Sequence, residues 1–288
     1  MFINQIPRLQ SITTKLCTVA LRAGARIMEY YGKSEIKYEL KHDGTLVTEA
    51  DIESERIIIS FLKSLSPDIP IISEEQVSGD ARLHELHNDS KTETFWLVDP
   101  LDGTEGFIQK KVRFSVNIGL VQNNKPMLGV IYFPVSDILY SGITGFRSYM
   151  LQNASTDIRC EHVQIQTRAR GKGEGLVALL DSRIPYSSEL KMMLHKVKIS
   201  RRVVDSDSDR LCRVSRGEID IATISRSFEW DTIAGHAVLK GAGGNLINFD
   251  GTELQYGKPG FNNPCLMAHG RILDYGESDS DLGCCSIE

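Results

Sequence analysis

The 288-residue sequence lacks a long apolar segment and an excess of basic charge. No uncharged apolar stretch approaches the roughly 18 residues that a membrane-spanning helix requires. Arg22 and Arg26 interrupt the apolar positions near the N-terminus, which a secretory signal would keep uncharged. The 33 lysines and arginines are outnumbered by 38 acidic residues, which gives a net charge of -5. These features argue against a membrane span, an export signal and broad, sequence-independent nucleic-acid binding.

The sequence also lacks paired cysteines of the C-x-x-C type. Its six cysteines are scattered along the chain: Cys17, Cys160, Cys212, Cys265, Cys284 and Cys285. In a chain of this length without an export signal, we expect them to be reduced and to pack mostly as small apolar side chains. No role follows from the adjacent pair near the C-terminus. The expected location is the cytoplasm.

Composition and length indicate a globular protein of two parts. Apolar residues make up 41% and charged residues 25% of the chain, which is ordinary for a folded domain. At about 150 residues per domain, the length indicates two domains or one large one. We predict an N-terminal α+β half at residues 1–155 with a mainly antiparallel sheet and a C-terminal α/β half at residues 156–276. Residues 277–288 are predicted to form a disordered, acidic tail.

The pattern of apolar residues predicts the elements of both halves. A helix is expected up to Tyr31 and another from Thr48 to Pro67, followed by strands at 69–72, 95–98, 114–121, 127–133 and 138–143. Residues 153–175 are polar and basic and predict a connection. After it, strands at 175–180, 198–204 and 219–224 alternate with helices at 188–197, 210–216 and 232–241, and Asp250-Gly251 predicts a turn. This alternation favours a more parallel sheet.

Two aspartates follow the strand predicted at 95–98, in the segment Asp99-Pro100-Leu101-Asp102-Gly103-Thr104. Pro100 restricts the backbone and so aims both carboxylates, while Gly103 lets a ligand approach the chain closely. A helix starting near Thr104 would offer N–H groups to a phosphate. The alternative is a simple strand-to-helix turn in which Asp102 caps the helix.

Three other acidic sites occupy comparable places. Glu74 and Glu75 follow a predicted strand, although such a pair often lies on the surface. Asp51 stands three residues after Thr48, which is also the spacing of a helix-capping box. Asp231 opens a helix, whose dipole favours a carboxylate there without any catalytic role.

Together these segments resemble the magnesium-dependent, lithium-sensitive phosphatases related to inositol monophosphatase. The matches are Thr48-Glu49-Ala50-Asp51, Ile72-Ser73-Glu74-Glu75, Asp99-Pro100-Leu101-Asp102-Gly103-Thr104 and Trp230-Asp231-Thr232-Ile233-Ala234-Gly235. They occur in the order typical of that family, within residues 41–244. Within the family, residues 67–75, 96–104 and 230–238 most resemble the bacterial 3'(2'),5'-bisphosphate nucleotidases. The resemblance implies an α/β fold (α+β by some schemes), a layered αβαβα sandwich with the site between its halves.

The resemblance also implies the metal ligands. Glu74, Asp99, the Leu101 carbonyl and the Thr104 hydroxyl would hold a first Mg²⁺, and Asp99, Asp102 and Asp231 a second, with two or three ions in all. Two unit charges about 4 Å apart repel by about 4 kcal/mol at an effective dielectric of about 20, so converging carboxylates need cations or protons. An all-oxygen site suits Mg²⁺ or Mn²⁺ rather than zinc. Inhibition by Li⁺ is implied by the resemblance alone.

The same resemblance implies the catalytic and substrate-binding residues. Asp51 and Thr104 would take the proton from the attacking water, with Glu74 as the neighbouring candidate. Gly103 and Thr104 would offer backbone N–H groups to the phosphate, and Ser208, Arg210 and Asp231 would contact the substrate. The implied reaction is hydrolysis of adenosine 3',5'-bisphosphate to AMP and phosphate.

Two departures leave the substrate open. These nucleotidases usually carry a Gly-Ser-Ser-Leu-Lys-like segment where this chain has Ser206-Asp207-Ser208-Asp209-Arg210, and Glu105 stands where a lysine is common. Asp207 and Asp209 would repel a polyanion unless they point outward or a cation intervenes. An inositol phosphate or another sugar phosphate is therefore an alternative. An RNA- or polymerase-associated regulator is a further one, which the complete ligand set and the acidic balance disfavour.

Two clusters of basic residues are candidates for binding a second phosphate: Lys196, Lys198, Arg201 and Arg202, or Arg168, Arg170 and Lys172. Either cluster could equally form a solvated face. His236 could contact a base or ribose, or lie in the core. The expected partner is a small phosphorylated substrate, and the sequence does not choose between a monomer and a homodimer.

Overall fold

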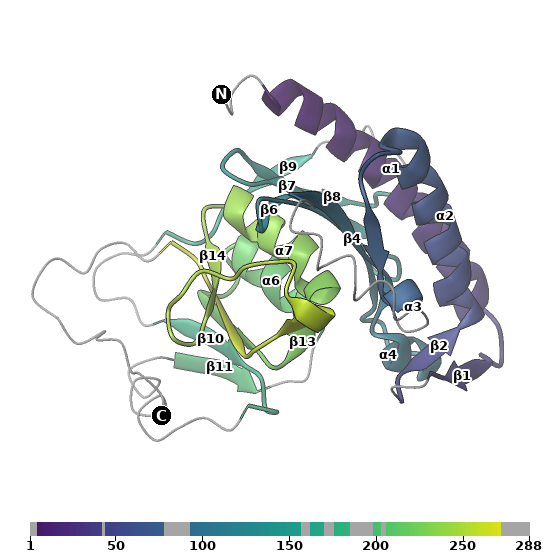
Figure 1. Ribbon diagram of the computed structural model, residues 1–288. Coiled ribbons are helices and arrows are strands. Elements are labelled where there is room, and N and C mark those ends of the chain that lie inside the picture. The colour runs from purple at the N-terminus through teal and green to yellow at the C-terminus, as the bar shows by residue number, and fades with distance from the viewer. Residues whose placement is uncertain are drawn as a thin grey trace, which may run out of the picture.

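A computed structural model describes residues 5–41, 44–77, 93–156, 162–169, 176–184, 198–202 and 206–271. Two long helices, α1 (Ile6–Tyr31) and α2 (Glu49–Leu65), pack side by side and cover one face of a large sheet (Figure 1). The apolar stripe of α1 is buried against α2 and the sheet, as its spacing predicts. Helix α2 begins after Thr48 and ends two residues before Pro67, as expected.

The large sheet has seven strands in the order β3-β4-β5-β6-β7-β8-β9. They are β3 (Ile71–Ser73), β4 (Thr94–Asp102), β5 (Ser115–Gln122), β6 (Lys125–Phe133), β7 (Ile138–Ile143), β8 (Ser148–Gln152) and β9 (Val163–Ile165). Only β3 and β4 pair in parallel, and the predicted hairpin turns at Asn123 and Asn124, both with positive φ. Neither β8 nor β9 was predicted, and β9 lies in the segment taken as a connection. The proposed division of the chain near residue 155 stays a prediction.

Strand β4 does not end at Val98, where the sequence places its end. It continues to Asp102, which pairs with Ser115 of β5, and its register shifts between Asp99 and Asp102. Pro100 lies in this irregular part and has no N–H to donate to the ladder. The two aspartates therefore belong to the irregular end of a buried strand.

A second sheet has the order β11-β10-β12-β16-β14. Its strands are β10 (Val177–Leu180), β11 (Lys198–Arg202), β12 (Ile221–Ile224), β14 (Asn245–Asn248) and β16 (Leu266–His269). Only β11, β10 and β12 are parallel, so the expected parallel character holds for three strands. Two small antiparallel pairs complete the strands: β1 (Tyr38–Leu40) with β2 (Leu46–Thr48), and β13 (Ser227–Phe228) with β15 (Asn262–Asn263).

Helices α6 (Asp207–Ser215) and α7 (Glu229–Gly241) form the layer between the two sheets (Figure 1). Both begin three residues earlier than predicted, α6 because the Ser206 side chain accepts the N–H of Asp209 at its start. Helix α7 approaches β6 so closely that a Cβ on Gly129 would lie 2.4 Å from the carbonyl oxygen of Ala234.

The chain has the α/β sandwich fold that the sequence predicts. The described layers are the α1–α2 pair, the large sheet, the α6–α7 pair and the second sheet. The helix predicted at 188–197, the tail at 277–288, Cys160, Cys284 and Cys285 lie outside the described residues. Cys17, Cys212 and Cys265 are unpaired thiols. None of the described helices combines the length and the apolar character needed to cross a membrane.

Candidate active site

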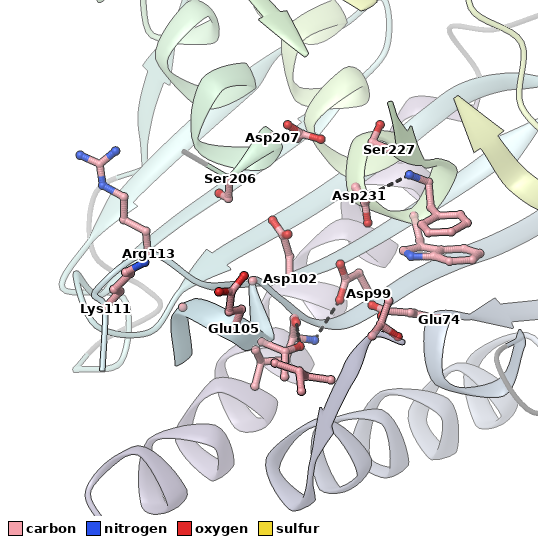
Figure 2. Close-up of a pocket in the computed structure, with 18 of the residues that line it drawn as sticks. Glu74, Asp99, Asp102, Glu105, Lys111, Arg113, Ser206, Asp207, Ser227 and Asp231 are labelled. Atoms are coloured by element: carbon pink, nitrogen blue, oxygen red, sulfur yellow. Dashed lines mark hydrogen bonds between the residues drawn. The ribbon is translucent and has the colours of Figure 1, made fainter. Parts of the chain in front are cut away.

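Acidic side chains from separate segments line one cavity of about 1090 Å³. Glu74 opens α3 (Glu74–Val77) directly after β3, Asp99 and Asp102 lie at the irregular end of β4, and Asp231 lies in the first turn of α7. Figure 2 shows these four side chains gathered around the same space. The structure thus brings together the four carboxylates that the sequence analysis singled out as metal ligands.

The Asp99 and Asp102 carboxyls are strongly perturbed by their surroundings. Burial raises the pKa of Asp99 well above its usual range, and the nearby charges of Glu74 and Asp102 raise it further. Burial raises the pKa of Asp102 to about 6, although hydrogen bonds, one of them from Ser115 at 3.3 Å, partly oppose the shift. Both carboxyls therefore resist ionisation when no cation is near.

Asp231 is held by the backbone at the start of α7. Its Oδ2 accepts the N–H of Phe228 at 2.7 Å, so it serves as part of the helix cap as well as lining the cavity. Burial, followed by the charges of Asp102 and Asp207, raises its pKa well above the usual value. The cavity therefore holds more carboxylates than can remain ionised together at neutral pH without added positive charge.

Lys41 supplies such a charge, which no sequence motif indicated. Its ammonium lies 3.0 Å from Oε1 of Glu74 and 2.8 Å from Oε1 of Glu75, and only 7% of its side chain is exposed. Burial alone would lower the pKa of Lys41, but the two glutamates raise it above its usual value. Burial and the charge of Glu74 raise the pKa of Glu75 to about 8. The Glu74–Glu75 pair is therefore not a solvated surface pair.

Asp51 caps a helix and also reaches the site, so both interpretations of its spacing hold. Its Oδ2 accepts the backbone N–H of Thr48 at 2.8 Å, and its Oδ1 accepts the hydroxyl of Thr104 at 2.9 Å. Burial raises the pKa of Asp51 to about 6. Ser54, on the same helix, donates to the carbonyl of Pro100 at 2.7 Å and so fixes α2 against the end of β4.

Gly103 and Thr104 lie at the point where β4 passes into a short helix, α4 (Thr104–Ile108). Gly103 has φ 90°, a conformation that favours glycine, and a Cβ there would lie 3.2 Å from the carbonyl oxygen of Arg113. Gly103, Thr104 and Glu105 all line the cavity, and Leu101 does so as well. The backbone here can approach a bound phosphate closely.

The predicted substrate contacts on α6 are placed differently. Ser208 is buried and its hydroxyl donates to the carbonyl oxygen of Asp231 at 3.3 Å. Arg210 is fully buried, donates to the carbonyl oxygen of Thr223 at 2.8 Å and lies 3.6 Å from Asp181. The structure does not bring the Arg210 side chain to the cavity, where α6 instead presents Ser206 and Asp207. The Arg210 side chain points into the core because the buried carboxylate of Asp181 pairs with it there.

The two extra acids of this segment have cations beside them. Asp209 lies 3.5 Å from Arg113 and 3.9 Å from Arg213. Asp207 is nine-tenths buried, its Oδ1 lies 3.9 Å from Arg183, and burial together with the charge of Asp102 raises its pKa to about 7. The repulsion that these acids would exert on a polyanionic substrate is therefore reduced.

The structure describes the two predicted basic clusters only in part. Arg168 is exposed away from the cavity, Lys198, Arg201 and Arg202 lie on β11, and Lys196, Arg170 and Lys172 lie outside the described residues. His236 lies in the core, 3.0 Å from the hydroxyl of Tyr256, and burial lowers its pKa to about 3. Among the described residues, the basic side chains that line the cavity are Lys110, Lys111, Arg113, Arg183 and Arg226. Arg183 and Arg226 each follow a strand that the sequence predicts. Their position after these strands could have identified them as candidate ligand-binding residues.

The donor set fits a hard divalent cation in its chemistry. All its side chains offer oxygen, which suits Mg²⁺. Within the described ranges, no three acidic, imidazole or thiol side chains already stand at the spacing of a metal site. One oxygen of Asp99 accepts the N–H of Leu101 at 3.0 Å, one of Asp231 accepts that of Phe228, and one of Glu74 faces Lys41. Binding an ion would therefore require small movements of these side chains.

Comparison with known proteins gives one consistent result. The sequence model of the inositol monophosphatase family matches residues 8–274. The 3'(2'),5'-bisphosphate nucleotidase CysQ of Escherichia coli K12 is 34% identical over 254 residues, which cover 87% of this chain and 96% of that protein. CysQ of Buchnera aphidicola is also 34% identical, over 88% and 90% of the two chains.

Solved structures agree with these sequence matches. The crystal structure of CysQ from Bacteroides thetaiotaomicron has a TM-score of 0.72 and 27% identity, and covers 88% of this chain and 95% of that one. The inositol monophosphatase from Anabaena has a TM-score of 0.67 and 25% identity, with 91% of each chain covered.

Proposed function

Because the chain belongs to the inositol monophosphatase family and is a phosphatase, we propose that it removes the 3'-phosphate of adenosine 3',5'-bisphosphate and leaves AMP. The observation that carries the phosphatase chemistry is the meeting of Glu74, Asp99, Asp102 and Asp231 in one cavity. The choice of substrate rests on the nucleotidase relatives, which match most of the chain at 34% identity.

Members of this family are generally magnesium-dependent. We propose that Glu74, Asp99, the Leu101 carbonyl and the Thr104 hydroxyl hold one Mg²⁺, and that Asp99, Asp102 and Asp231 hold another. Bound Mg²⁺ would lower the pKa of the attacking water and offset charge on the phosphate and the leaving oxygen. The raised pKa values of Asp99 and Asp231 support this assignment, because burial and then the charges of neighbouring acids disfavour the ionised forms, which a bound cation would favour.

The Thr104–Asp51 pair is proposed to remove the proton from the attacking water. A water beside Thr104 gives its proton to Oγ1, while the Thr104 hydroxyl passes its own proton to Oδ1 of Asp51, 2.9 Å away. With a pKa of about 6, Asp51 is mostly ionised at neutral pH and remains basic enough to accept a proton. The water oxygen bonds to phosphorus as the bond to the 3'-oxygen breaks, and the leaving oxygen takes up a proton from solvent.

A phosphate-release assay with Mg²⁺ tests this proposal. The substrates are adenosine 3',5'-bisphosphate, its 5'-sulfated analogue, inositol 1-phosphate and fructose 1,6-bisphosphate. We expect the highest kcat/KM for adenosine 3',5'-bisphosphate. If inositol 1-phosphate were preferred by more than about tenfold, the substrate proposal would fail while the phosphatase chemistry remained. Release from none of the four, together with recovery of RNA on the purified protein, would favour the regulatory alternative.

A further inference from the structure

Two arginines stand at the same edge of the second sheet. Arg183 follows β10 by three residues and Arg226 follows β12 by two, and these two strands pair in parallel through Ala178–Ile221 and Leu179–Ala222. Both arginines line the cavity that holds the carboxylates. The carboxyl ends of parallel strands are where α/β sheets commonly bind ligands. The two arginines are therefore placed where a ligand in the cavity could contact them together.

The guanidinium of Arg183 is held in a fixed position by a buried carboxylate. Its Nε lies 3.0 Å from Oδ1 of Asp181 and its Nη2 lies 2.6 Å from Oδ2, while Asp181 is fully buried. About half of the Arg183 side chain, 49%, remains exposed. No acceptor among the described residues is bonded to its Nη1, which is left to bind a ligand. An arginine fixed in this way loses little freedom on binding an anion.

Asp181 is itself supported from the core and from the neighbouring loop. The buried guanidinium of Arg210 lies 3.6 Å from it, and Ser225, directly before Arg226, donates its N–H to Oδ2 at 3.4 Å. Burial alone would raise the pKa of Asp181, but the bonds from Arg183 lower it to about 2. Asp181 therefore stays ionised and links the loops that carry Arg183 and Arg226.

The charges on this wall leave a positive surplus. Arg183 and Arg210 offset Asp181 and Asp207, whereas Arg226 is exposed and forms no ion pair within the described residues. Two other cations of the cavity differ in this respect, since Arg113 pairs with Asp209 and Lys110 donates to backbone carbonyls. Lys111 is also exposed and has no ion pair within the described residues, but Figure 2 draws it at the far side of the cavity from Ser227, the neighbour of Arg226.

We propose that Arg183 and Arg226 bind a second phosphate of the substrate, the one that is not hydrolysed. This inference rests on the proposed function and deepens it, because it makes these arginines the residues that select a bisphosphorylated substrate. A phosphate oxygen accepts from Nη1 of Arg183, and Arg226 adds charge from the adjacent loop. Arg210, expected from the sequence to touch the substrate, acts instead as a positioning residue through Asp181.

The test compares two substrates that differ only in the second phosphate, adenosine 3',5'-bisphosphate and adenosine 3'-monophosphate. Arg183→Gln is expected to lower kcat/KM for the bisphosphate by about 10- to 100-fold, mainly through KM, since a hydrogen bond to a charged group is lost. Arg226→Gln, which removes no internal contact of the described fold, is expected to lower it by up to about tenfold. For the monophosphate, both variants should stay within about twofold of wild type.

Lys111→Gln is the matched control, because it removes one unpaired cavity charge, as Arg226→Gln does, but at the far side of the cavity from the proposed site. We expect it to change kcat/KM for either substrate by less than about threefold. Equal losses on both substrates, an equal effect of the control, or a wild-type enzyme without preference for the bisphosphate would overturn the proposal.

Binding of AMP, which keeps only the second phosphate, separates this proposal from the proposed function. Calorimetry should show AMP affinity reduced by Arg183→Gln and Arg226→Gln to the same extent as kcat/KM for the bisphosphate. AMP binding tests the second-phosphate site even if the wild-type protein releases phosphate from neither nucleotide. In that case the proposed function fails, while the second-phosphate site is still tested. Unchanged AMP affinity in the well-folded Arg226→Gln variant and in Arg183→Gln refutes the second-phosphate site.

Discussion

The hydroxyl of Thr104 donates to Oδ1 of Asp51 at 2.9 Å, although 53 residues separate the two in sequence. The contact joins the cap of α2 to the start of α4 at the wall of the cavity. It depends on the position of α2, which Ser54 fixes through the carbonyl of Pro100. One helix cap therefore places a carboxylate beside the proposed position of the attacking water.

Removal of the Thr104 hydroxyl or of the Asp51 charge should slow the chemical step. We expect Thr104→Ala and Asp51→Asn each to lower kcat by about 10²- to 10⁴-fold with little change in KM, which steady-state phosphate release would measure. Thr104→Ser keeps the hydroxyl and should retain most of the activity. A Thr104→Ala enzyme with kcat near that of wild type would exclude the proton relay.

Asp99→Asn should abolish magnesium-dependent phosphate release and leave the fold intact. Asp99 is proposed to bind both ions, so its substitution should reduce phosphate release more than substitution of a residue that binds only one ion. Calorimetric titration with Mg²⁺ should show weakened binding, and circular dichroism should show an unchanged fold. Asp209→Asn serves as the control, because Asp209 is an acid that pairs with Arg113 and Arg213 and is not a proposed metal ligand. This variant should bind Mg²⁺ as tightly as the wild type does. Near-normal turnover in Asp99→Asn would refute the metal assignment.

Lys41→Met should destabilise the protein mainly when metal is absent. The ammonium of Lys41 lies between Glu74 and Glu75, so its loss leaves two close carboxylates without their cation. In a chelator we expect the free energy of unfolding to fall by about 1–3 kcal/mol, with a smaller loss at saturating Mg²⁺. Lys125→Met, which breaks an exposed pair with Glu253, should cost less than about 1 kcal/mol under both conditions. Equal losses with and without Mg²⁺ would show that Lys41 and the metal act independently.

Stabilisation by Mg²⁺ should increase with pH. Asp102 has a folded-state pKa of about 6, above the usual value of an unfolded aspartate, and those of Asp99 and Asp231 are raised as well. Carboxyls with a raised pKa stabilise the metal-free fold at low pH, and this contribution is lost as pH rises through the folded-state pKa. Metal binding needs the ionised form and so strengthens over the same range.

Thermal unfolding with Mg²⁺ and with a chelator measures this effect at each pH. The difference between the Tm with Mg²⁺ and the Tm with chelator should grow between about pH 4 and 7. In the Asp231→Asn variant this difference should depend less on pH. A difference in Tm that did not change with pH would mean that these carboxyls do not bind the ion.

Gly129→Ala should weaken the packing between the large sheet and α7. A Cβ at this position would lie 2.4 Å from the carbonyl oxygen of Ala234, and backbone cannot yield as a flexible side chain does. We expect a loss of about 1–3 kcal/mol in chemical denaturation. At Gly32, the corresponding Cβ would meet only ordinary contacts, 3.6 Å from the nearest oxygen, so Gly32→Ala should be tolerated. Comparable stability of the two variants would contradict the close approach of α7.

Local patterns were sufficient for several of the elements, and the family motifs singled out the four carboxylates that line the cavity. The stripe of α1, the cap at Thr48 and the turn at Asn123-Asn124 are set by neighbours in the sequence, and the structure contains all three. Strands β8 and β9 and the continuation of β4 to Asp102 were among the features missed. All of these depend on pairing with partner strands, which no pattern within one short segment reveals.

The sequence by itself determined which residues offer oxygen donors at the ends of the helices and strands. It also determined the family motifs that contain these residues. It could not determine which way each side chain turns. Only the tertiary structure directed Arg210 into the core, set Lys41 between Glu74 and Glu75, and brought Arg183 and Arg226 to the cavity. The physical reason is that a charged side chain is oriented by the partner it meets in space. Asp181, the partner of Arg210, is 29 residues away along the chain.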